Sequence, residues 1–521
     1  MKIIRKISLL NFKKFETFEV SFDDEINLLI GDNESGKSTI LTALDLVMRG
    51  SRNKVETIGL ESLFNTTAIN TFLSSDRKLA MMPELRIELY LNEQNNEITN
   101  GHNNLDKKPC DGIRLVCKPN DEYSESIKDV LKKPDCLFPF EYYSISFTTF
   151  NDVTYNGYNK HLKHILIDNS LTSSEYAMKE YVKDIYNSKI LNNTEKFLHQ
   201  HEYRNYKEEF KNKAFKEINE RLDSNYKFAI KSNPKSNLEN DLIIYEGDVS
   251  IDNKGKGKQS IIKTTLALSK SGEDFDAVLI EEPENHLSHS NMKKLIQKVI
   301  NSTGKQIFVA THSDLVSTRL DLRKSILLNS SSENRVKLED LPEDTSKFFI
   351  KAPDNNILEF ILSDKVILVE GDAEFILLEA LYKKKMKKSL IESNIHVISV
   401  GGTSFPRYLD IAKLLDIKTA VITDNDKKYE ENITNRYSKY KKDNIGVFAD
   451  EKDSRYTFEV CIYEDNKNIC DELFSAKRRK LSVQEYMLKD KAEVAYQLLE
   501  NKPNDLKIPE YIDRAFEWIN N

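Results

Sequence analysis

Residues 31–38 read GDNESGKS, which fits the pattern GxxxxGK[ST] of a phosphate-binding loop. The loop follows an apolar run at 26–30 and precedes a helical pattern from Ser38 onward, the strand–loop–helix context that the pattern requires. Its glycines let backbone N–H groups surround the β- and γ-phosphates of a nucleotide, Lys37 adds positive charge, and Ser38 can offer its hydroxyl to Mg²⁺. A chance glycine-rich turn is the alternative. We expect the following loop residues to bind ATP: Asn33, Gly36, Lys37, Ser38 and Thr39.

A second set of polar side chains follows two later apolar runs. The run 277–280 ends in Glu281 and Glu282, and carboxylates at the end of a buried strand are costly unless they meet a cation. We expect Glu281 to lie near the Mg²⁺ ion and Glu282 to polarise the water that attacks the γ-phosphate. The run 308–310 leads to His312, which could sense the γ-phosphate or be a structural histidine.

Three more strand ends carry carboxylates or glycines in the last third of the chain. Glu370 follows the apolar run 366–369, and Glu374 comes four residues later, so the two can converge at a helix start. Residues 401–403 read Gly-Gly-Thr, and the next strand ends in Asp424 and Asp426, which would face one pocket if the chain stayed extended. Such oxygen ligands suit Mg²⁺ or Mn²⁺, and two ions can clamp a phosphodiester. Each cluster alone would be read as an acidic turn.

These residues need rigid elements to position them. Strand–helix alternation predicts an α/β fold with parallel sheets whose ligands bind at the carboxyl ends of the strands. We expect two halves of an ATPase domain at 1–155 and 241–330, separated by a helical insertion at 156–240. The insertion is either an interaction and dimerisation arm or a solvated helical cover. A polar linker at 331–362 would lead to a second α/β domain at 363–521.

The composition of the chain indicates its class and the cellular compartment in which we expect it. With 521 residues, 39% hydrophobic and 31% charged, it can bury two or more cores, and its net charge of −7 leaves only local patches for nucleic acid. The five cysteines show no CxxC spacing, which favours reduced thiols over a disulfide framework or a zinc site. The charged start does not look like a signal peptide, and no apolar run is long enough to cross a membrane. We expect a cytoplasmic protein without a membrane partner.

The nucleotide motifs together resemble the ABC-type P-loop ATPases of the SMC/RecF kind, in which a large insertion separates the two halves of the domain. The resemblance implies a signature loop that closes on the ATP of a second copy, hence a homodimer or a tetramer. Gly255 and Gly257, in the sequence KGKGKQ, are the matching residues. The family's serine is absent here, which puts efficient hydrolysis in doubt. A lysine-rich surface loop is the alternative.

The carboxylate pattern resembles the Toprim domain, and the chain as a whole resembles the OLD (overcoming lysogenization defect) family of ATP-dependent endonucleases. The nuclease subunit of the Gabija antiphage system and retron-associated OLD nucleases belong to that family. The resemblance implies Glu370 as general acid/base or metal ligand and Glu374, Asp424 and Asp426 as metal ligands. It also implies a further ligand, matched by Glu459, and a lysine that stabilises the transition state, matched by Lys491.

Three basic clusters, at 383–388, 436–442 and 477–480, suggest a path for nucleic-acid phosphates, although each alone is a solvated helix face. We therefore expect an ATP-regulated, metal-dependent DNA endonuclease that nicks or cuts both strands. The family implies an antiphage role, with a helicase or a retron reverse transcriptase and its DNA–RNA hybrid as partners. The alternatives are a clamp or sensor that holds a nucleic acid or protein without cutting, and a Toprim nuclease acting on RNA.

Overall fold

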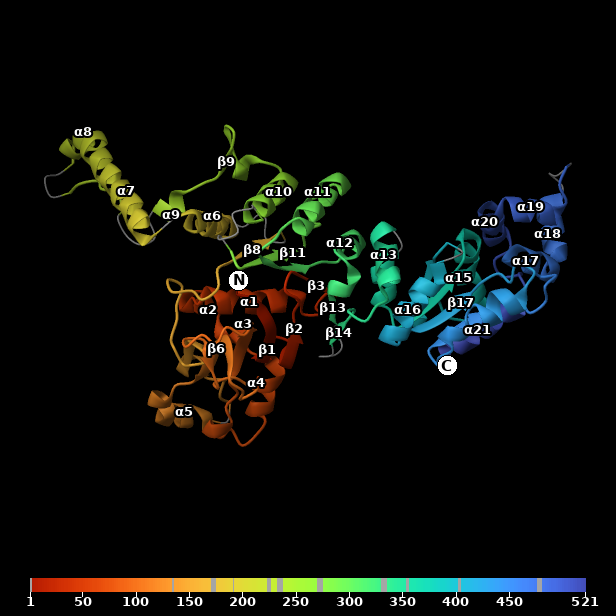
Figure 1. Cartoon of the computed structure of the whole chain (residues 1–521), viewed down its shortest axis with the longest axis horizontal. Helices are drawn as coiled ribbons and strands as arrows, with labels where there is room; N and C mark the ends of the chain where they lie inside the picture. Colours follow the sequence, from red (N-terminus) through yellow and green to blue (C-terminus); the bar gives the residue numbers. More distant parts are fainter. Residues whose placement is uncertain are drawn as a thin grey trace. The chain divides into compact units, whose positions relative to one another are not determined.

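The computed structural model divides by its internal contacts into two units, which we describe separately (Figure 1). Unit 1 comprises 1–312 with 326–335, and unit 2 comprises 313–325 with 336–521. The structure describes residues 2–133, 135–169, 175–190, 192–222, 226–231, 238–268, 275–328, 335–352, 356–401, 404–475 and 480–521, without the side chains of 175–177 and 335–337.

Unit 1 begins with an antiparallel sheet whose strands follow the order β2-β1-β4-β6-β5, with β7 paired to β6. The alternation of apolar residues near the N-terminus predicted two strands around a turn, and β1 and β2 confirm it. The strands are β1 (Ile4–Phe12), β2 (Phe15–Ser21), β4 (Leu85–Leu91), β5 (Asn100–Gly101), β6 (Cys110–Pro119) and β7 (Tyr143–Thr149).

The second sheet of unit 1 carries the nucleotide motifs and has the order β14-β13-β3-β12-β11-β8. β3, β12, β11 and β8 run parallel, so their carboxyl ends meet at one edge. All residues of β3 are buried, as a strand covered on both faces requires. The strands are β3 (Ile26–Gly31), β8 (His164–Asp168), β11 (Ala277–Glu281), β12 (Gln306–Ala310), β13 (Ser325–Leu328) and β14 (Arg335–Lys337).

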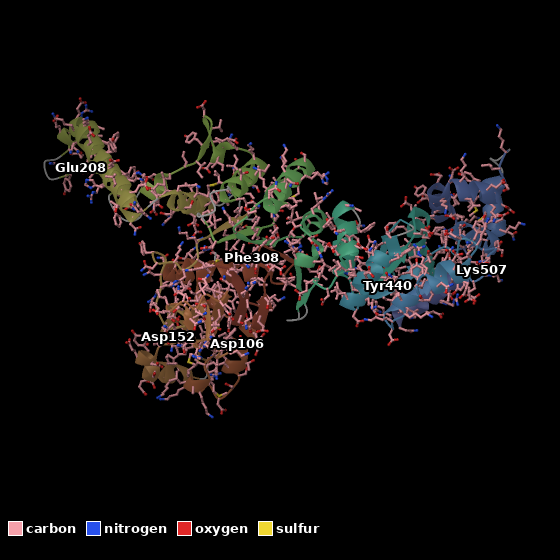
Figure 2. All side chains as sticks on the ribbon, in the orientation of Figure 1. Asp106, Asp152, Glu208, Phe308, Tyr440 and Lys507 are labelled. Atoms are coloured by element: carbon pink, nitrogen blue, oxygen red, sulfur yellow. The ribbon has the colours of Figure 1, made fainter. Side chains whose placement is uncertain are left out.

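Helix α1 (Lys37–Arg49) contacts strands of both sheets and buries most of its residues between them. Phe308, which Figure 2 labels on β12, packs edge-on against Phe22 with ring centroids 4.9 Å apart. Four shorter helices surround the antiparallel sheet: α2 (Arg52–Ile58), α3 (Leu60–Leu63), α4 (Thr66–Leu73) and α5 (Ser124–Leu131). Among the described residues, none of the helices combines the length and the apolar character needed to cross a membrane.

The stretch 156–240, which we expected to be a helical insertion, begins with strand β8 of the parallel sheet, so its helical part starts later than expected. The helices described there are α6 (Glu175–Lys189), α7 (Asn193–Ala214), α8 (Lys216–Glu220) and α9 (Leu238–Asp241). The strand signal predicted at 242–251 is a short hairpin of β9 (Tyr245–Glu246) and β10 (Val249–Ser250). Two helices then alternate with the last parallel strands, α10 (Lys256–Ala267) and α11 (His289–Ile300).

Unit 2 is built on a parallel sheet of the order β16-β15-β17-β18, as strand–helix alternation predicted. Its strands are β15 (Lys365–Val369), β16 (Ile395–Ser399), β17 (Lys418–Ile422) and β18 (Ile445–Phe448). Its helices are α12 (Asp314–Arg319), α13 (Glu343–Lys351), α14 (Ile357–Ile361), α15 (Asp372–Met386), α16 (Phe405–Leu415), α17 (Phe458–Asp465), α18 (Lys467–Phe474), α19 (Val483–Lys489), α20 (Lys491–Asn501) and α21 (Glu510–Asn520).

The segment 331–362 differs from the polar linker that we expected. Its described part contains α13 and α14, and both pack on α16 within unit 2. Phe349 and Phe360 explain the difference, because both rings are fully buried and meet the ring of Tyr408 edge-on. Pro353 of this segment lies outside the described residues.

A buried ionic cluster joins α1 to its surroundings. Asp45 accepts hydrogen bonds from Arg49 and His164, at 2.9 and 2.8 Å, and forms an ion pair of 2.8 Å with Lys54. Arg49 also reaches Asp184 on α6 at 3.2 Å. Although burial alone would raise the pKa of Asp45, Arg49 and His164 hold it well below its ordinary value. Asp45 is therefore ionised in the folded protein.

Replacing Asp45 by Asn should destabilise unit 1 by about 3 kcal/mol, because it leaves buried cations without their carboxylate. Urea unfolding followed by circular dichroism, with hydrogen exchange of α1 peptides, measures the loss. Glu56→Gln removes the exposed Arg52–Glu56 pair on α2 and should change stability by less than about 0.5 kcal/mol. Trp518 of unit 2 should report an unchanged transition in both variants. Equal stability of Asp45→Asn and the parent would contradict the assignment.

Candidate nucleotide and metal sites

The phosphate-binding loop lies between β3 and α1, as its pattern predicts. The Lys37 ammonium group donates to the carbonyl oxygens of Gly31 and Asp32, at 2.7 and 2.8 Å. Burial lowers the pKa of Lys37 to about 8, although Asp32 and Glu282 act in the opposite direction. Position 36 requires a glycine, because the backbone φ is 107° and a Cβ atom there would lie 2.5 Å from the Phe15 ring.

The parallel sheet brings the second half of the motif to the same edge. Glu281, the last residue of β11, accepts a hydrogen bond from Ser38, the second residue of α1. Burial raises the pKa of Glu281, although the bond from Ser38 opposes the shift, and nearby Asp168 adds to it. A carboxylate and a hydroxyl paired in this way are suitable ligands for Mg²⁺ beside a nucleotide.

Glu282 and His312 also meet at this edge. The His312 Nε2 atom lies 3.8 Å from a Glu282 carboxylate oxygen. Glu282 has a left-handed backbone with φ 45°, and its N–H donates to the carbonyl of Ala310 at 2.9 Å. Glu284 accepts from the Thr311 hydroxyl and the His312 N–H, at 2.8 and 2.7 Å, and so anchors the histidine loop. The structure thus brings Lys37, Ser38, Glu281, Glu282 and His312 to one edge of the sheet.

Sequence reasoning missed three neighbours of this site. Asp168 ends β8 in register with Glu281, and the N–H of Asn169 donates to the Glu281 carbonyl at 3.3 Å. Lys14, in the turn between β1 and β2, donates to the carbonyls of Glu34 and Ser35, each at 3.0 Å. An apolar strand ending in Asp-Asn just before the insertion was the signal for the first pair. Nothing local marked Lys14.

The glycines of KGKGKQ lie at the start of α10. Gly255 is its N-cap, and a Cβ atom on Gly257 would lie 2.3 Å from the carbonyl oxygen of His286. Lys254 and Lys258 both pair with Glu246, at 2.8 and 3.1 Å. Glu246 therefore offsets part of the positive charge of this loop, and close packing accounts for Gly257.

A second polar site lies in unit 2, at the carboxyl ends of β15 and β17. A cavity of about 190 Å³ opens there between the starts of α15 and α20. It is lined by Glu370, Gly371, Asp372, Ala373, Glu374, Asp424, Lys491 and Ala492. Three of the predicted metal ligands and the predicted lysine therefore share one cavity.

The acidic side chains of this cavity have strongly raised pKa values. Burial and the neighbouring Glu370 raise the pKa of Asp424 to about 8, and burial with Glu459 raises that of Glu374 to about 7. Lys491 forms an ion pair of 3.0 Å with Glu459. Burial tends to lower the pKa of Lys491, but Glu459 and the other carboxylates raise it. One cation faces four acidic groups, so the site is short of positive charge.

The residues present fit a divalent cation. Glu459 is 3% exposed, and its Oε1 atom has no hydrogen-bond partner among the described residues. Oxygen donors that are buried, crowded and incompletely bonded are those that Mg²⁺ or Mn²⁺ stabilises. Among the described residues, no three His, Cys, Asp or Glu side chains already converge closely enough to hold an ion. Binding would therefore require the carboxylates to turn inward.

Asp426 does not join them. Asn425 is buried, and its amide donates to the carbonyls of Asp450 and Lys452, at 2.7 and 3.0 Å. The chain turns there, and Asp426 is exposed with φ 50°. The expectation that both aspartates extend toward one pocket is therefore wrong for this structure. Gly402 and Thr403 of the glycine strand end lie outside the described residues.

The basic clusters are partly engaged within the chain. Lys385 pairs with Asp513 and Glu517 of α21, at 2.6 and 2.9 Å, and Lys384 donates to the carbonyl of Leu506. Lys439 lies over the ring of Tyr440, which Figure 2 labels, at 4.8 Å. The cluster at 477–480 lies outside the described residues except for Lys480.

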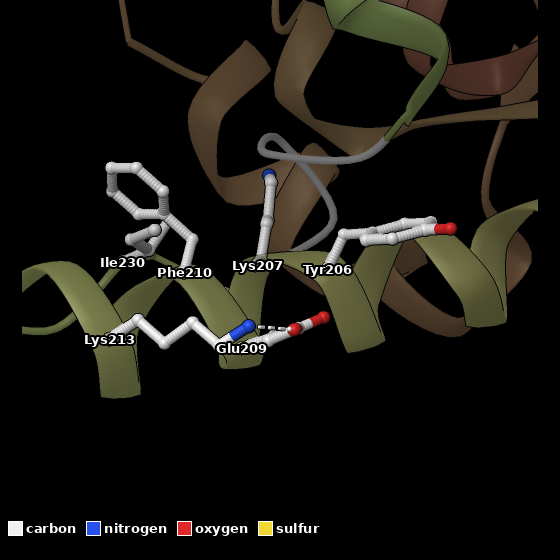
Figure 3. Close-up of a pocket in the computed structure, with 6 residues that line it drawn as sticks. All are labelled: Tyr206, Lys207, Glu209, Phe210, Lys213 and Ile230. Carbon is white, nitrogen blue, oxygen red and sulfur yellow. Dashed lines mark hydrogen bonds and ion pairs between the residues drawn. The ribbon is translucent and has the colours of Figure 1, made fainter.

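A separate cavity of about 460 Å³ lies on α7 in the insertion (Figure 3). Its lining is mostly apolar and consists of Tyr206, Lys207, Glu209, Phe210, Lys213 and Ile230. Glu209 pairs with Lys213, as the dashed line in Figure 3 marks. Because its charged groups are paired, this cavity is suited to contact with an apolar partner rather than to catalysis.

Two protein families match the chain. The family described as "AAA domain, putative AbiEii toxin, Type IV TA system" matches residues 26–318, which is more than half of the chain. The family described as "Overcoming lysogenization defect protein-like, TOPRIM domain" matches residues 361–426. The first match spans the nucleotide motifs from β3 to His312, and the second spans Glu370, Glu374 and Asp424.

Among curated proteins, the chain is 27% identical over 169 residues to the Old nuclease of Escherichia phage P2, covering 30% of this chain and 29% of the nuclease. It is 49% identical over 41 residues to the DNA replication and repair protein RecF of Agathobacter rectalis, covering 8% of this chain and 11% of RecF. The chain thus spans less than a third of the length of these relatives.

Solved structures with some likeness include the C-terminal region of the Xanthomonas campestris pv. campestris OLD protein. It is 23% identical, with a TM-score of 0.23, covering 30% of this chain and 92% of that one. The SMC head domain from Thermotoga maritima is 12% identical, with a TM-score of 0.28, covering 63% of this chain and 94% of that one. From the two family matches, the chain belongs to the AAA-domain family, and an OLD-like Toprim domain follows its ATPase domain.

Proposed function

We propose that this chain is an ATP-regulated, divalent-metal-dependent endonuclease that cuts or nicks DNA. The observation that carries the proposal is the cavity of unit 2, where Glu370, Glu374 and Asp424 meet beside Lys491. Bound Mg²⁺ or Mn²⁺ would supply charge stabilisation for the attacking and leaving oxygens of a phosphodiester. The protein's contribution is to hold the carboxylates in one place, where the chain itself supplies too little positive charge to balance them.

The side chains have separate roles in this proposal. Glu370, Glu374, Asp424 and Glu459 would hold the ions, and Glu370 would also accept a proton from the attacking water. Lys491 reaches the cavity from the start of α20 and is kept protonated by its acidic neighbours. It would stabilise the negative charge that develops on the phosphate. Asp426 would act as a ligand only after the turn at Asn425 rearranges.

The ATPase half would control this chemistry. Lys37 holds the phosphates, Ser38 with Glu281 holds Mg²⁺, and Glu282 beside His312 polarises the attacking water. The loop with Gly255 and Gly257 of a second copy would complete the site, which makes a homodimer or tetramer the working form. ATP would act by favouring the paired state, since only that state offers the γ-phosphate its second set of contacts.

DNA is the substrate class that we propose, because the chain is similar to a nuclease and, over 41 residues, to a DNA replication and repair protein. An antiphage role in the cytoplasm, with a helicase or a retron reverse transcriptase and its DNA–RNA hybrid as partners, is part of the same proposal. The cleavage experiment described below also distinguishes this function from the two alternatives. Binding of nucleic acid without cleavage would indicate a clamp or sensor, and cleavage of RNA alone would change the substrate.

The insertion would act as the contact arm between copies. All of α7 is described, and none of its 22 residues is buried. Phe197, Tyr206 and Phe210 on this helix are 63%, 69% and 54% exposed. A helix that covers a domain buries one apolar face, whereas a helix that exposes three aromatic rings has surface to bury against a partner.

Lys37→Ala should weaken ATP binding on the order of 100-fold, because charged hydrogen bonds to phosphates contribute about 1.5–3 kcal/mol each. Glu282→Gln should bind ATP as the parent does and hydrolyse it at least about 100 times more slowly. Isothermal titration and phosphate release measure the two effects. Lys128→Ala, on the surface of α5, is the control and should change neither. Unimpaired ATP binding by Lys37→Ala would contradict the site.

Asp424→Asn and Glu370→Gln should each slow the nicking of plasmid DNA in Mg²⁺ or Mn²⁺ on the order of 100-fold or more. Asp426→Asn should cause a smaller loss than Asp424→Asn, because Asp426 is exposed outside the cavity. Gel analysis of supercoiled plasmid, with and without ATP, is the measurement. Asp443→Asn, exposed on the same unit, should cut normally. If Asp424→Asn cuts as well as the parent, the cavity is not the nuclease site.

The double variant Tyr206→Ser/Phe210→Ser should weaken self-association by about tenfold or more, since buried aromatic anchors dominate protein interfaces. It should keep the parent's helix content, because α7 buries none of its residues. Sedimentation velocity across a concentration series measures the change. Tyr496→Ser, half-exposed on α20, is the matched control. Unchanged sedimentation would favour the solvated cover.

A further inference from the structure

A buried tyrosine lies next to the metal site without being part of the predicted ligand set. Tyr437 follows the π-helical turn Glu430–Asn435 and is only 4% exposed. Its N–H donates to the carbonyl of Ile433 at 3.2 Å, and its own carbonyl accepts from Tyr440 at 2.9 Å. Backbone bonds on both sides therefore fix the position from which the side chain extends.

The hydroxyl of Tyr437 is unsatisfied. Although it is buried, it makes no hydrogen bond of normal geometry among the described residues, and the Thr423 hydroxyl is the neighbour within reach of it. Most buried hydroxyls in proteins are paired, and an exception calls for an explanation in function. Tyr440, three residues later and equally buried, shows the usual situation, because its hydroxyl bonds to Asp410 and to the carbonyl of Pro406, each at 3.0 Å.

The neighbours of the Tyr437 hydroxyl indicate what it serves. It lies beside Thr423, whose hydroxyl donates to a Glu370 carboxylate oxygen at 3.5 Å, the limit of a hydrogen bond. Burial raises the pKa of Tyr437, and although Arg436 opposes this, Glu370 is near enough to add to it. Glu370 itself lines the cavity. The Tyr437 hydroxyl is thus a hydrogen-bond donor close to the Glu370 carboxylate, which itself has only a long hydrogen bond from Thr423 among the described residues.

We propose that Tyr437 is a positioning residue whose hydroxyl donates to the Glu370 carboxylate when Glu370 turns to hold the divalent ion. The inference rests on the proposed metal-dependent function and adds the group that orients one of its ligands. Partners of this kind around a metal site restrict the carboxylate to the orientation that binds the ion. Thr423 alone, at its present distance, does this poorly.

Tyr437→Phe should maintain or raise the stability of the metal-free protein and at the same time weaken metal binding. Tyr437→Phe removes a hydroxyl that is unpaired without metal, so the metal-free protein should melt at the same temperature as the parent or higher. The same change should weaken Mn²⁺ binding roughly tenfold, as loss of a partner around a metal ligand does. A tyrosine that only fills the core would lower the melting temperature and leave Mn²⁺ binding unchanged.

The experiment uses the full chain without nucleotide. Melting in EDTA is followed by the fluorescence of Trp518, and Mn²⁺ binding is followed by electron paramagnetic resonance of the free ion. Tyr440→Phe is the matched control, and because its hydroxyl is bonded, it should lower the melting temperature and bind Mn²⁺ normally. Asp424→Asn defines the signal lost when the cavity itself is disabled.

The outcomes separate the two proposals. Weaker Mn²⁺ binding by Tyr437→Phe without loss of stability supports the inference. Normal Mn²⁺ binding by Tyr437→Phe, with Asp424→Asn impaired, overturns the inference and leaves the metal site intact. If Asp424→Asn binds Mn²⁺ as the parent does, the metal site fails, and the role of Tyr437 fails with it.

Discussion

The crowding of carboxylates at the carboxyl edge of the unit 2 sheet is the constraint on which the rest depends. Parallel strands place the residues that follow them at one edge, so Glu370 after β15 and Asp424 after β17 are neighbours. Burial there penalises their charge, and each raises the cost for the others. Among the described residues, Lys491 is the cation that opposes these shifts. The fold therefore maintains an arrangement that is unfavourable by itself and favourable with a cation.

The two units solve a related problem in different ways. In unit 1, Glu281 also has a raised pKa, but the hydrogen bond from Ser38 and the charge of Lys13 oppose the shift, and Lys37 lies at the same edge. In unit 2, four acidic groups share one lysine, and the Glu459 Oε1 atom is left without a hydrogen bond among the described residues. The first site has much of its balancing charge in the chain, whereas the second depends more on what it binds.

Much of the fold and of both sites could be predicted from the sequence, because the signals were local. A strand followed directly by GxxxxGK[ST], or by a carboxylate, places that residue at a sheet edge whatever the rest of the chain does. Asp426 was misplaced because its position depends on Asn425 bonding to carbonyls some 25 residues later, which no local pattern encodes. Tyr437 was missed for the same reason. The helices of 343–361 were hidden because they are short, with nine and five residues, and because their partners lie far along the chain: both pack on α16, and α14 also packs on β16.

Helix α1 connects features that are otherwise distant in the sequence. It begins at Lys37 in the phosphate loop and ends at Arg49, whose guanidinium is held by Asp45 and by Asp184 of α6. Thirteen residues of α-helix form a stiff rod about 20 Å long, and such a rod tilts or slides as one piece. Because the far end of this rod is paired with Asp184, the phosphate loop and the first helix after β8 are attached to the two ends of one rigid element.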